Sequence, residues 1–88
     1  WERNDSWYLN VDTPKYIETF DDWARINLLP DNLLYIPFAP GGNYILTRET
    51  VHKYSVDFYD NMREMLPYKQ LPGEAQCCER SYWLMWNR

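Results

Sequence analysis

Only two short segments of this sequence have the composition of β-strands, and this limits the folds open to the chain. Residues 33–38 form an apolar run that Pro37 ends, and residues 43–46 form a second run after the Pro40-Gly41-Gly42 loop. A sheet of two strands is not stable by itself. We therefore expect either an isolated hairpin packed under helices or two strands of a larger sheet whose other strands lie outside the chain. The lack of an initiator Met before Trp1 favours the second arrangement.

Helical patterns fill most of the remaining sequence. The first helix begins either at Thr13-Pro14 or, in a second interpretation, at Thr19, where Asp22 three residues later forms a capping box. The later helices begin at a Thr or Ser cap or with an acidic first turn. The expected ranges are part or all of 14–27, then 48–53, 56–66 and 74–86. Two short strands with three to four helices predict an α/β protein, or α+β for the chain in isolation, with residues 1–88 forming a single partial domain.

Composition excludes several classes of function. The net charge is −4 and the pI about 4.8, and the scattered Lys and Arg residues lack the basic stripe of a nucleic-acid-binding protein. No apolar run approaches the roughly 20 residues that span a bilayer. The adjacent Cys77 and Cys78 are poorly placed to bridge each other and have no neighbouring His for a zinc site, so we expect both to be buried thiols.

Aromatic residues make up 18% of the chain, with 5 Trp and 8 Tyr. Such rings bury large areas and keep a polar edge, which suits cores, interfaces and sugar-stacking sites alike. Core packing is the expected role for most of them. The rings that would form a sugar-stacking platform in the alternative interpretation are Trp7, Trp23, Tyr44, Trp83 and Trp86.

The last predicted helix carries the acidic residue of greatest interest, Glu79. At helical spacing it falls among apolar and aromatic residues, and desolvation there would raise its pKa and suit it to act as a general base. The alternative is a structural Glu79 that pairs with Arg25, Arg48 or Arg63 or accepts backbone hydrogen bonds. Glu74, at the start of the helix, is expected to cap it or to face solvent. The other members of the predicted stripe are Ala75, Cys78, Tyr82, Trp83 and Trp86.

Other polar residues carry weaker signals. The glycine loop lacks the spacing of a phosphate-binding loop, and an ordinary turn is its simplest interpretation. His52 is the only histidine and is expected on the exposed side of a short helix. Asp21-Asp22 is explained by the dipole at a helix start, and the sequence offers no third oxygen ligand for a metal ion beside it.

Three segments together resemble a known family. Residues 41–49, Gly-Gly-Asn-Tyr-Ile-Leu-Thr-Arg-Glu, are similar to the Gly-Gly-x-Tyr-hydrophobic-hydrophobic-Ser/Thr-Arg-Glu/Asp segment of many GT-A-fold glycosyltransferases. Phe58-Tyr59 and Glu79-Arg80-Ser81-Tyr82-Trp83 resemble helices at the end of a fungal and algal family of glycosyltransferase-like proteins. The resemblance implies a carboxyl-side fragment of a GT-A-like sheet domain.

The same resemblance implies roles for individual residues. The parent protein would transfer a sugar from a nucleotide-sugar donor to a carbohydrate acceptor hydroxyl, with Glu79 as catalytic base. The acceptor side would be formed by Gly41, Gly42, Asn43, Glu74 and Trp83. The Asp-x-Asp element of metal-dependent members is missing from this sequence. We therefore expect no cofactor in the chain, a divalent metal (Mn or Mg) at most in the parent, and no turnover by the chain alone.

Two other interpretations remain open. The chain is alternatively an aromatic-rich carbohydrate- or protein-binding module without catalysis, or a small helical domain with a hairpin and no site.

Overall fold

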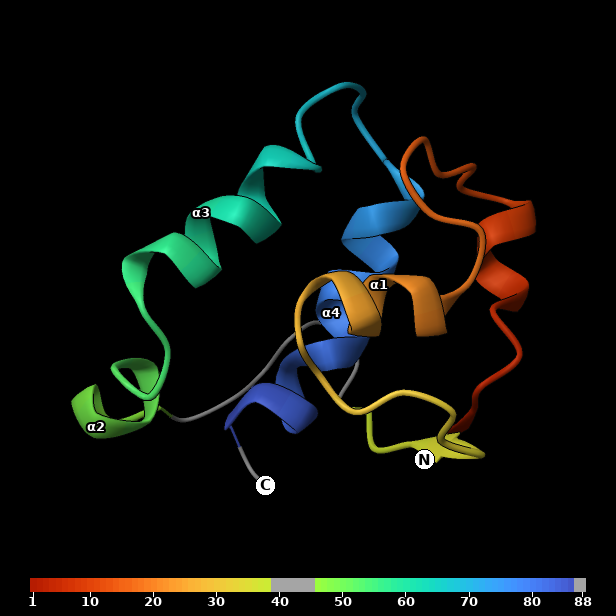
Figure 1. Cartoon of the computed structure of the whole chain (residues 1–88). Coiled ribbons are helices and arrows are strands. Elements are labelled where there is room, and N and C mark those ends of the chain that lie inside the picture. The colour runs from red at the N-terminus through yellow and green to blue at the C-terminus, as the bar shows by residue number, and fades with distance from the viewer. Residues whose placement is uncertain (39–45, 87–88) are drawn as a thin grey trace.

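A computed structural model describes residues 1–38 and 46–86 of the chain (Figure 1). Within these residues it contains four α-helices, one 3-10 helix and one two-stranded sheet. The elements in chain order are β1 (Glu2–Arg3), η1 (Trp7–Asn10), α1 (Phe20–Ile26), β2 (Tyr35–Ile36), α2 (Arg48–Val51), α3 (Val56–Glu64) and α4 (Gly73–Trp86). This arrangement confirms the mixed α+β class. None of the described helices is long and apolar enough to cross a membrane.

The sheet pairs the beginning of the chain with its middle. β1 and β2 are antiparallel, with Glu2 opposite Ile36 and Arg3 opposite Tyr35. The backbone N–H of Asn4 donates to the Leu34 carbonyl at 2.9 Å, which continues the pairing by one bond. The predicted strand at 33–38 thus forms over two residues and pairs with the chain start. The other predicted strand, 43–46, lies outside the described residues except for Leu46, which is not in a strand.

Helix α1 starts at the second of its two predicted caps. The Thr19 side chain accepts a hydrogen bond from the Asp22 backbone N–H at 3.3 Å, and the Asp22 carboxylate accepts one from the Thr19 N–H at 3.1 Å. The start at Thr13-Pro14 is wrong, because the N–H groups of Lys15 and Tyr16 donate to the buried Glu74 carboxylate instead of entering a helix. Asp21 and Asp22 occupy the first turn, as the helix dipole predicts.

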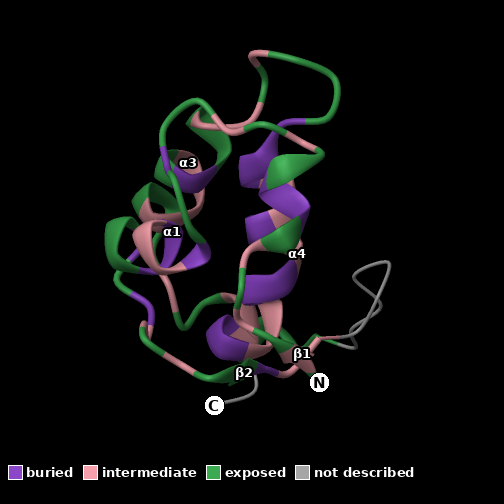
Figure 2. Cartoon of the chain, turned by 90° about the vertical axis from the view of Figure 1, so that its right-hand side faces the viewer, coloured by how far each residue is buried: buried purple, intermediate pink, exposed green. Residues whose placement is uncertain are grey.

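Helix α4 forms the centre of the core, with α1 and η1 against it on one side and α3 on another (Figures 1 and 2). The side chains that are fully buried include Phe20 and Trp23 of α1 and Met85 of α4. The radius of gyration is 12.4 Å, close to the value of about 12 Å that a globular chain of this length has.

The buried face of α4 is not the predicted one. Glu74, Cys77, Ser81 and Leu84 are buried on it, whereas Glu79 is only half-buried on another face. The most buried side of α4 is therefore turned about the helix axis from the predicted side. Other members of the predicted stripe are also only half-buried, namely Ala75, Tyr82, Trp83 and Trp86. The reason is that α4 carries apolar residues almost all round, so its packing partners decide which side is most buried. The expectation of two buried thiols is confirmed, since Cys77 and Cys78 are both free and buried.

Candidate functional site

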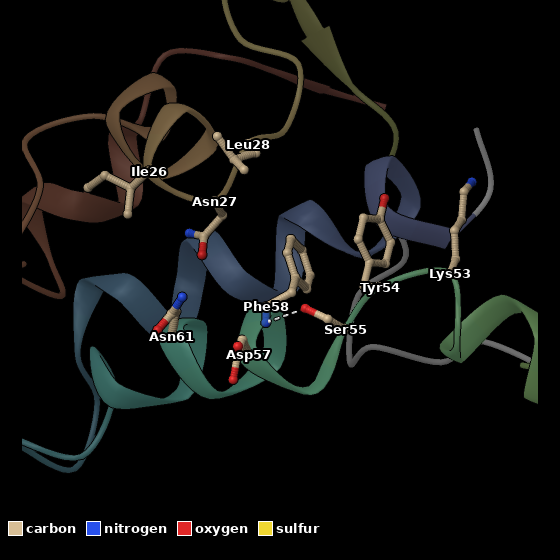
Figure 3. A pocket seen from close by; sticks show the side chains of 9 residues that line it. All are labelled: Ile26, Asn27, Leu28, Lys53, Tyr54, Ser55, Asp57, Phe58 and Asn61. Carbon is tan, nitrogen blue, oxygen red and sulfur yellow. Dashed lines mark hydrogen bonds between the residues drawn. The ribbon is translucent and has the colours of Figure 1, made fainter.

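A pocket of about 330 Å³ lies between the end of α1 and the first turns of α3 (Figure 3). This is at the small end of the range for small-molecule sites, roughly 300–1,000 Å³. The pocket combines aromatic, amide and charged side chains. Its lining residues are Ile26, Asn27, Leu28, Lys53, Tyr54, Ser55, Asp57, Phe58 and Asn61.

One wall is built by the end of α1. The Leu29 N–H donates to the Ala24 carbonyl at 2.8 Å and the Leu28 N–H to the Arg25 carbonyl at 3.2 Å, which is the Schellman arrangement. The residue at the turn, Leu28, has φ 57°, in the left-handed region that glycine usually occupies there. Its side chain is 87% exposed, so the turn holds an apolar group in solvent at the pocket rim.

The opposite wall is built by the start of α3. Ser55 caps this helix as predicted, accepting a hydrogen bond from the Phe58 N–H at 3.2 Å. The cap places Phe58 beside Tyr54, and the two rings stack with their centroids 4.2 Å apart and their planes 18° apart. Tyr59 meets both rings edge-on. These contacts fix two aromatic side chains at the pocket before any ligand arrives.

The polar groups of the pocket come from both walls. Asn27 is buried and donates from Nδ2 to the Trp23 carbonyl at 3.0 Å, while its Oδ1 is directed toward α3 (Figure 3). Asn61 projects from α3 on the facing side (Figure 3). Lys53 and Asp57 add one charge of each sign to the lining. Such a site suits a neutral ligand with both apolar and hydrogen-bonding surface.

The pocket is not lined by the predicted site residues that the structure describes. Glu79 and Trp83 lie four residues apart, one turn of α4, and both are half-buried on a face that does not contribute to this pocket. Glu79 and Trp83 are therefore neighbours on α4. They do not share the pocket with the aromatic pair of Tyr54 and Phe58. Gly41, Gly42 and Asn43 lie outside the described residues.

Glu74 occupies a different environment from the expected one. Its side chain is fully buried, and Oε2 accepts hydrogen bonds from the backbone N–H groups of Lys15 at 2.9 Å and Tyr16 at 2.7 Å. Oε1 accepts a hydrogen bond from the Tyr68 hydroxyl. Of the two predicted roles of Glu74, facing solvent is wrong, whereas the carboxylate also accepts a hydrogen bond from its own backbone N–H in the first turn of α4. Burial raises the pKa of this carboxyl group, but these donors outweigh burial and hold the pKa below its ordinary value.

The three arginines predicted as alternative partners of Glu79 are all exposed, and two of them pair with other acids. Arg25 pairs with Asp22 at 2.7 Å and with Asp31 at 3.0 Å, and Arg63 pairs with Asp60. Among the described arginines the buried one is Arg80, which belongs to the Glu79-Arg80-Ser81-Tyr82-Trp83 segment of the family resemblance.

The aromatic residues divide between the core and the surface. Trp23 is fully buried, as core packing predicts, and Trp83 and Trp86 are half-buried against the core. Trp7 is 52% exposed, while Tyr44 lies outside the described residues. The rings at the pocket are Tyr54 and Phe58. The sequence signals near them are the Ser55 cap that aligns α3 and the Phe58-Tyr59 pair of the family resemblance, and neither predicts a pocket.

His52 confirms its prediction, since it is exposed at the end of α2. In the described part of the chain, no three His, Cys, Asp or Glu side chains come together as metal ligands. Comparison of the chain with protein-family models, with curated proteins and with solved structures found no match.

Proposed function

We propose that this chain binds carbohydrate in the pocket between α1 and α3. The observation that carries the proposal is the stacked Tyr54–Phe58 pair beside the amides of Asn27 and Asn61. A pyranose ring has apolar C–H faces that pack on aromatic rings and a rim of hydroxyl groups. An asparagine amide both donates and accepts, so it can bind adjacent hydroxyls.

Rigidity of the pocket supports the same function. Phe58 is positioned by the Ser55 cap and by its ring neighbours, and Asn27 is held by its bond to the Trp23 carbonyl. A ligand then loses less free energy in ordering these side chains than it would on a mobile surface.

The test is titration of the ¹⁵N-labelled chain with a panel of neutral mono- and oligosaccharides, followed by NMR chemical shifts. We expect shifts at Asn27, Ser55 and Asn61 with a dissociation constant of about 1 mM, equivalent to about −4 kcal/mol. Asn61→Ala should weaken binding about fivefold, the effect of losing a hydrogen bond worth about 1 kcal/mol.

Asn10→Ala is the matched control, because Asn10 is an exposed asparagine on η1 that does not line the pocket. It should bind as the unaltered chain does. Absence of shifts at the pocket with every sugar, or equal affinities in the two variants, would contradict the proposal.

A glycosyltransferase role for a longer parent protein is the second proposal, and it rests on the sequence pattern at 41–49 and 79–83. Glu79 would take the proton of the acceptor hydroxyl while that oxygen bonds to the anomeric carbon and the nucleoside diphosphate leaves. Glu79 is half-buried one turn from Trp83 on α4, which supports this role, because a general base must lie within reach of an acceptor that the neighbouring ring can hold. The donor site, and any Mn or Mg ion, would belong to the parent.

In that parent, Glu79→Gln should lower turnover by roughly 10²–10⁴-fold, the usual contribution of a general base, and leave donor affinity unchanged. Glu64→Gln is the control, because Glu64 is an exposed glutamate at the end of α3. Undiminished turnover in the Glu79 variant would remove this residue from the mechanism. Sugar binding by the chain with Glu79→Gln in place would still support the pocket between α1 and α3.

A further inference from the structure

A second pocket, of about 210 Å³, lies between α3 and α4 and is lined by three sulfur-containing side chains. Met62 comes from α3, and Cys78 and Met85 come from α4. All three are at most 8% exposed. The remaining lining residues are Tyr59, Arg63, Leu66, Tyr82 and Trp86.

The sulfur atoms of Cys78 and Met62 lie about as far apart as two sulfur ligands of one metal ion. The Cys78 thiol donates toward the Met62 thioether, with 3.6 Å between Sγ and Sδ. Two sulfurs bound tetrahedrally to one ion, with metal–sulfur bonds of about 2.3 Å, lie about 3.8 Å apart. A metal ion in place of the thiol proton would therefore need only a small change in this distance.

Met85 supplies the third sulfur. Its Sδ lies 3.7 Å from the Ser81 hydroxyl, whose shorter bond is to the Cys78 carbonyl at 2.7 Å. The hydrogen bond from Ser81 to Met85 is therefore the weaker of the two. The Met85 thioether would lose only this weak bond on turning toward a metal ion.

The character of the pocket selects the metal. Among the described residues, the lining has no carboxylate and no imidazole, so hard ions such as Mg²⁺ and Ca²⁺ lack their preferred oxygen ligands there. Thiolate and thioether ligands favour Cu(I). One thiolate neutralises one monovalent ion, which limits the cost of burying the charge. The only charged lining residue, Arg63, is largely exposed and pairs with Asp60.

We propose that Met62, Cys78 and Met85 bind one Cu(I) ion between α3 and α4. On binding, the Cys78 thiol releases its proton to solvent and the thiolate and the two thioethers bond to the ion, with no change in oxidation state. This proposal is independent of the carbohydrate pocket.

The experiment is anaerobic titration of the 88-residue chain with Cu(I) in competition with a chromogenic Cu(I) chelator. We expect one ion per chain and an X-ray absorption spectrum that shows sulfur bonded directly to copper. Cys78→Ser should abolish binding. Met62→Leu and Met85→Leu should each weaken binding about tenfold or more, equivalent to about 1.4 kcal/mol.

The chain offers two matched controls. Cys77 is also buried but contacts Tyr8, and Met65 caps the end of α3 outside this pocket. Cys77→Ser and Met65→Leu should keep the full affinity. No Cu(I) bound by the unaltered chain, nitrogen or oxygen ligands in its spectrum, or equal losses in the Cys77 and Cys78 variants would overturn the proposal. If Cys78→Ser does not fold, the two methionine variants and the spectrum decide the outcome.

Discussion

The carboxylate of Glu2 binds the guanidinium group of Arg80, with Oε2 3.0 Å from Nη2, and so joins the first strand to the last helix. Arg80 is 4% exposed, and its guanidinium carbon lies 3.8 Å from the ring centroid of Tyr8 and 4.4 Å from that of Phe38. A buried ion pair is costly to break by removing one partner, because the other charge is left without compensation.

Glu2→Gln should therefore lower the free energy of unfolding by about 2–3 kcal/mol, measured by urea denaturation. Arg80→Met should cost less, because the carboxylate it leaves without a partner, that of Glu2, is 20% exposed and can reach water, and the Met side chain still fills the space between the rings. Arg63→Gln is the control: this arginine is largely exposed in its pair with Asp60, and surface pairs contribute little. Equal effects of Glu2→Gln and Arg63→Gln would contradict this account of the pair.

Glu74 should make the stability of the chain depend on acidic pH. Its pKa is held below the ordinary value of 4.5, so its carboxylate stabilises the fold fully above that pH. The stabilisation is lost as the pH falls through the lower, folded-state pKa. In urea denaturation between about pH 5 and pH 3, the unaltered chain should lose more stability than Glu74→Gln, which has no charge to titrate. Parallel curves would show that the Glu74 charge is not stabilised in the fold.

Gly73→Ala should destabilise the chain by about 1–3 kcal/mol, the range for overpacking. A Cβ at this position would overlap the Asp12 carbonyl oxygen and lie 2.8 Å from Leu9 Cδ2 and 2.9 Å from the Pro14 nitrogen. Two of these atoms belong to the backbone and cannot rotate away. Thermal unfolding measures the effect, and a rise in the melting temperature, as helix propensity alone predicts, would show that the segment at 12–14 yields without cost.

Leu28→Gly should stabilise the chain by about 1 kcal/mol, because it relieves the left-handed backbone at the end of α1. Asn32→Gly is the matched control, since Asn32 has the same φ of 57° but asparagine tolerates this region better. Its gain in thermal unfolding should be smaller. Equal gains would mean that Leu28 is not strained. Because Leu28 lines the pocket between α1 and α3, the same variant also tests whether its apolar side chain contributes to the proposed binding.

Local sequence patterns predicted the helices well where a side chain satisfies the helix start. The Thr19–Asp22 box and the Thr47 and Ser55 caps follow from bonds between close neighbours in the sequence. The same local reasoning placed His52 on the surface and both cysteines inside.

Local sequence patterns did not predict the candidate site. Its walls come from residues 26–28 and 53–61, and no pattern within either segment shows that the other lies opposite. The exposure of Leu28 follows from a left-handed turn at a leucine, which sequence preferences would assign to glycine.

The sequence alone determined the caps at Thr47 and Ser55, the burial of the two thiols and the mixed α+β class, because these depend on short-range hydrogen bonds and on composition. It left two starts open for the first helix, and the structure decided for Thr19. Only the tertiary structure decided that β2 pairs with β1, that Arg80 is buried with Glu2, and that Glu74 rather than Glu79 is the buried acid of α4. The physical reason is that a buried charge is stable only where its partners meet it. The backbone donors to Glu74 and the carboxylate that binds Arg80 lie about 60 to 80 residues away along the chain.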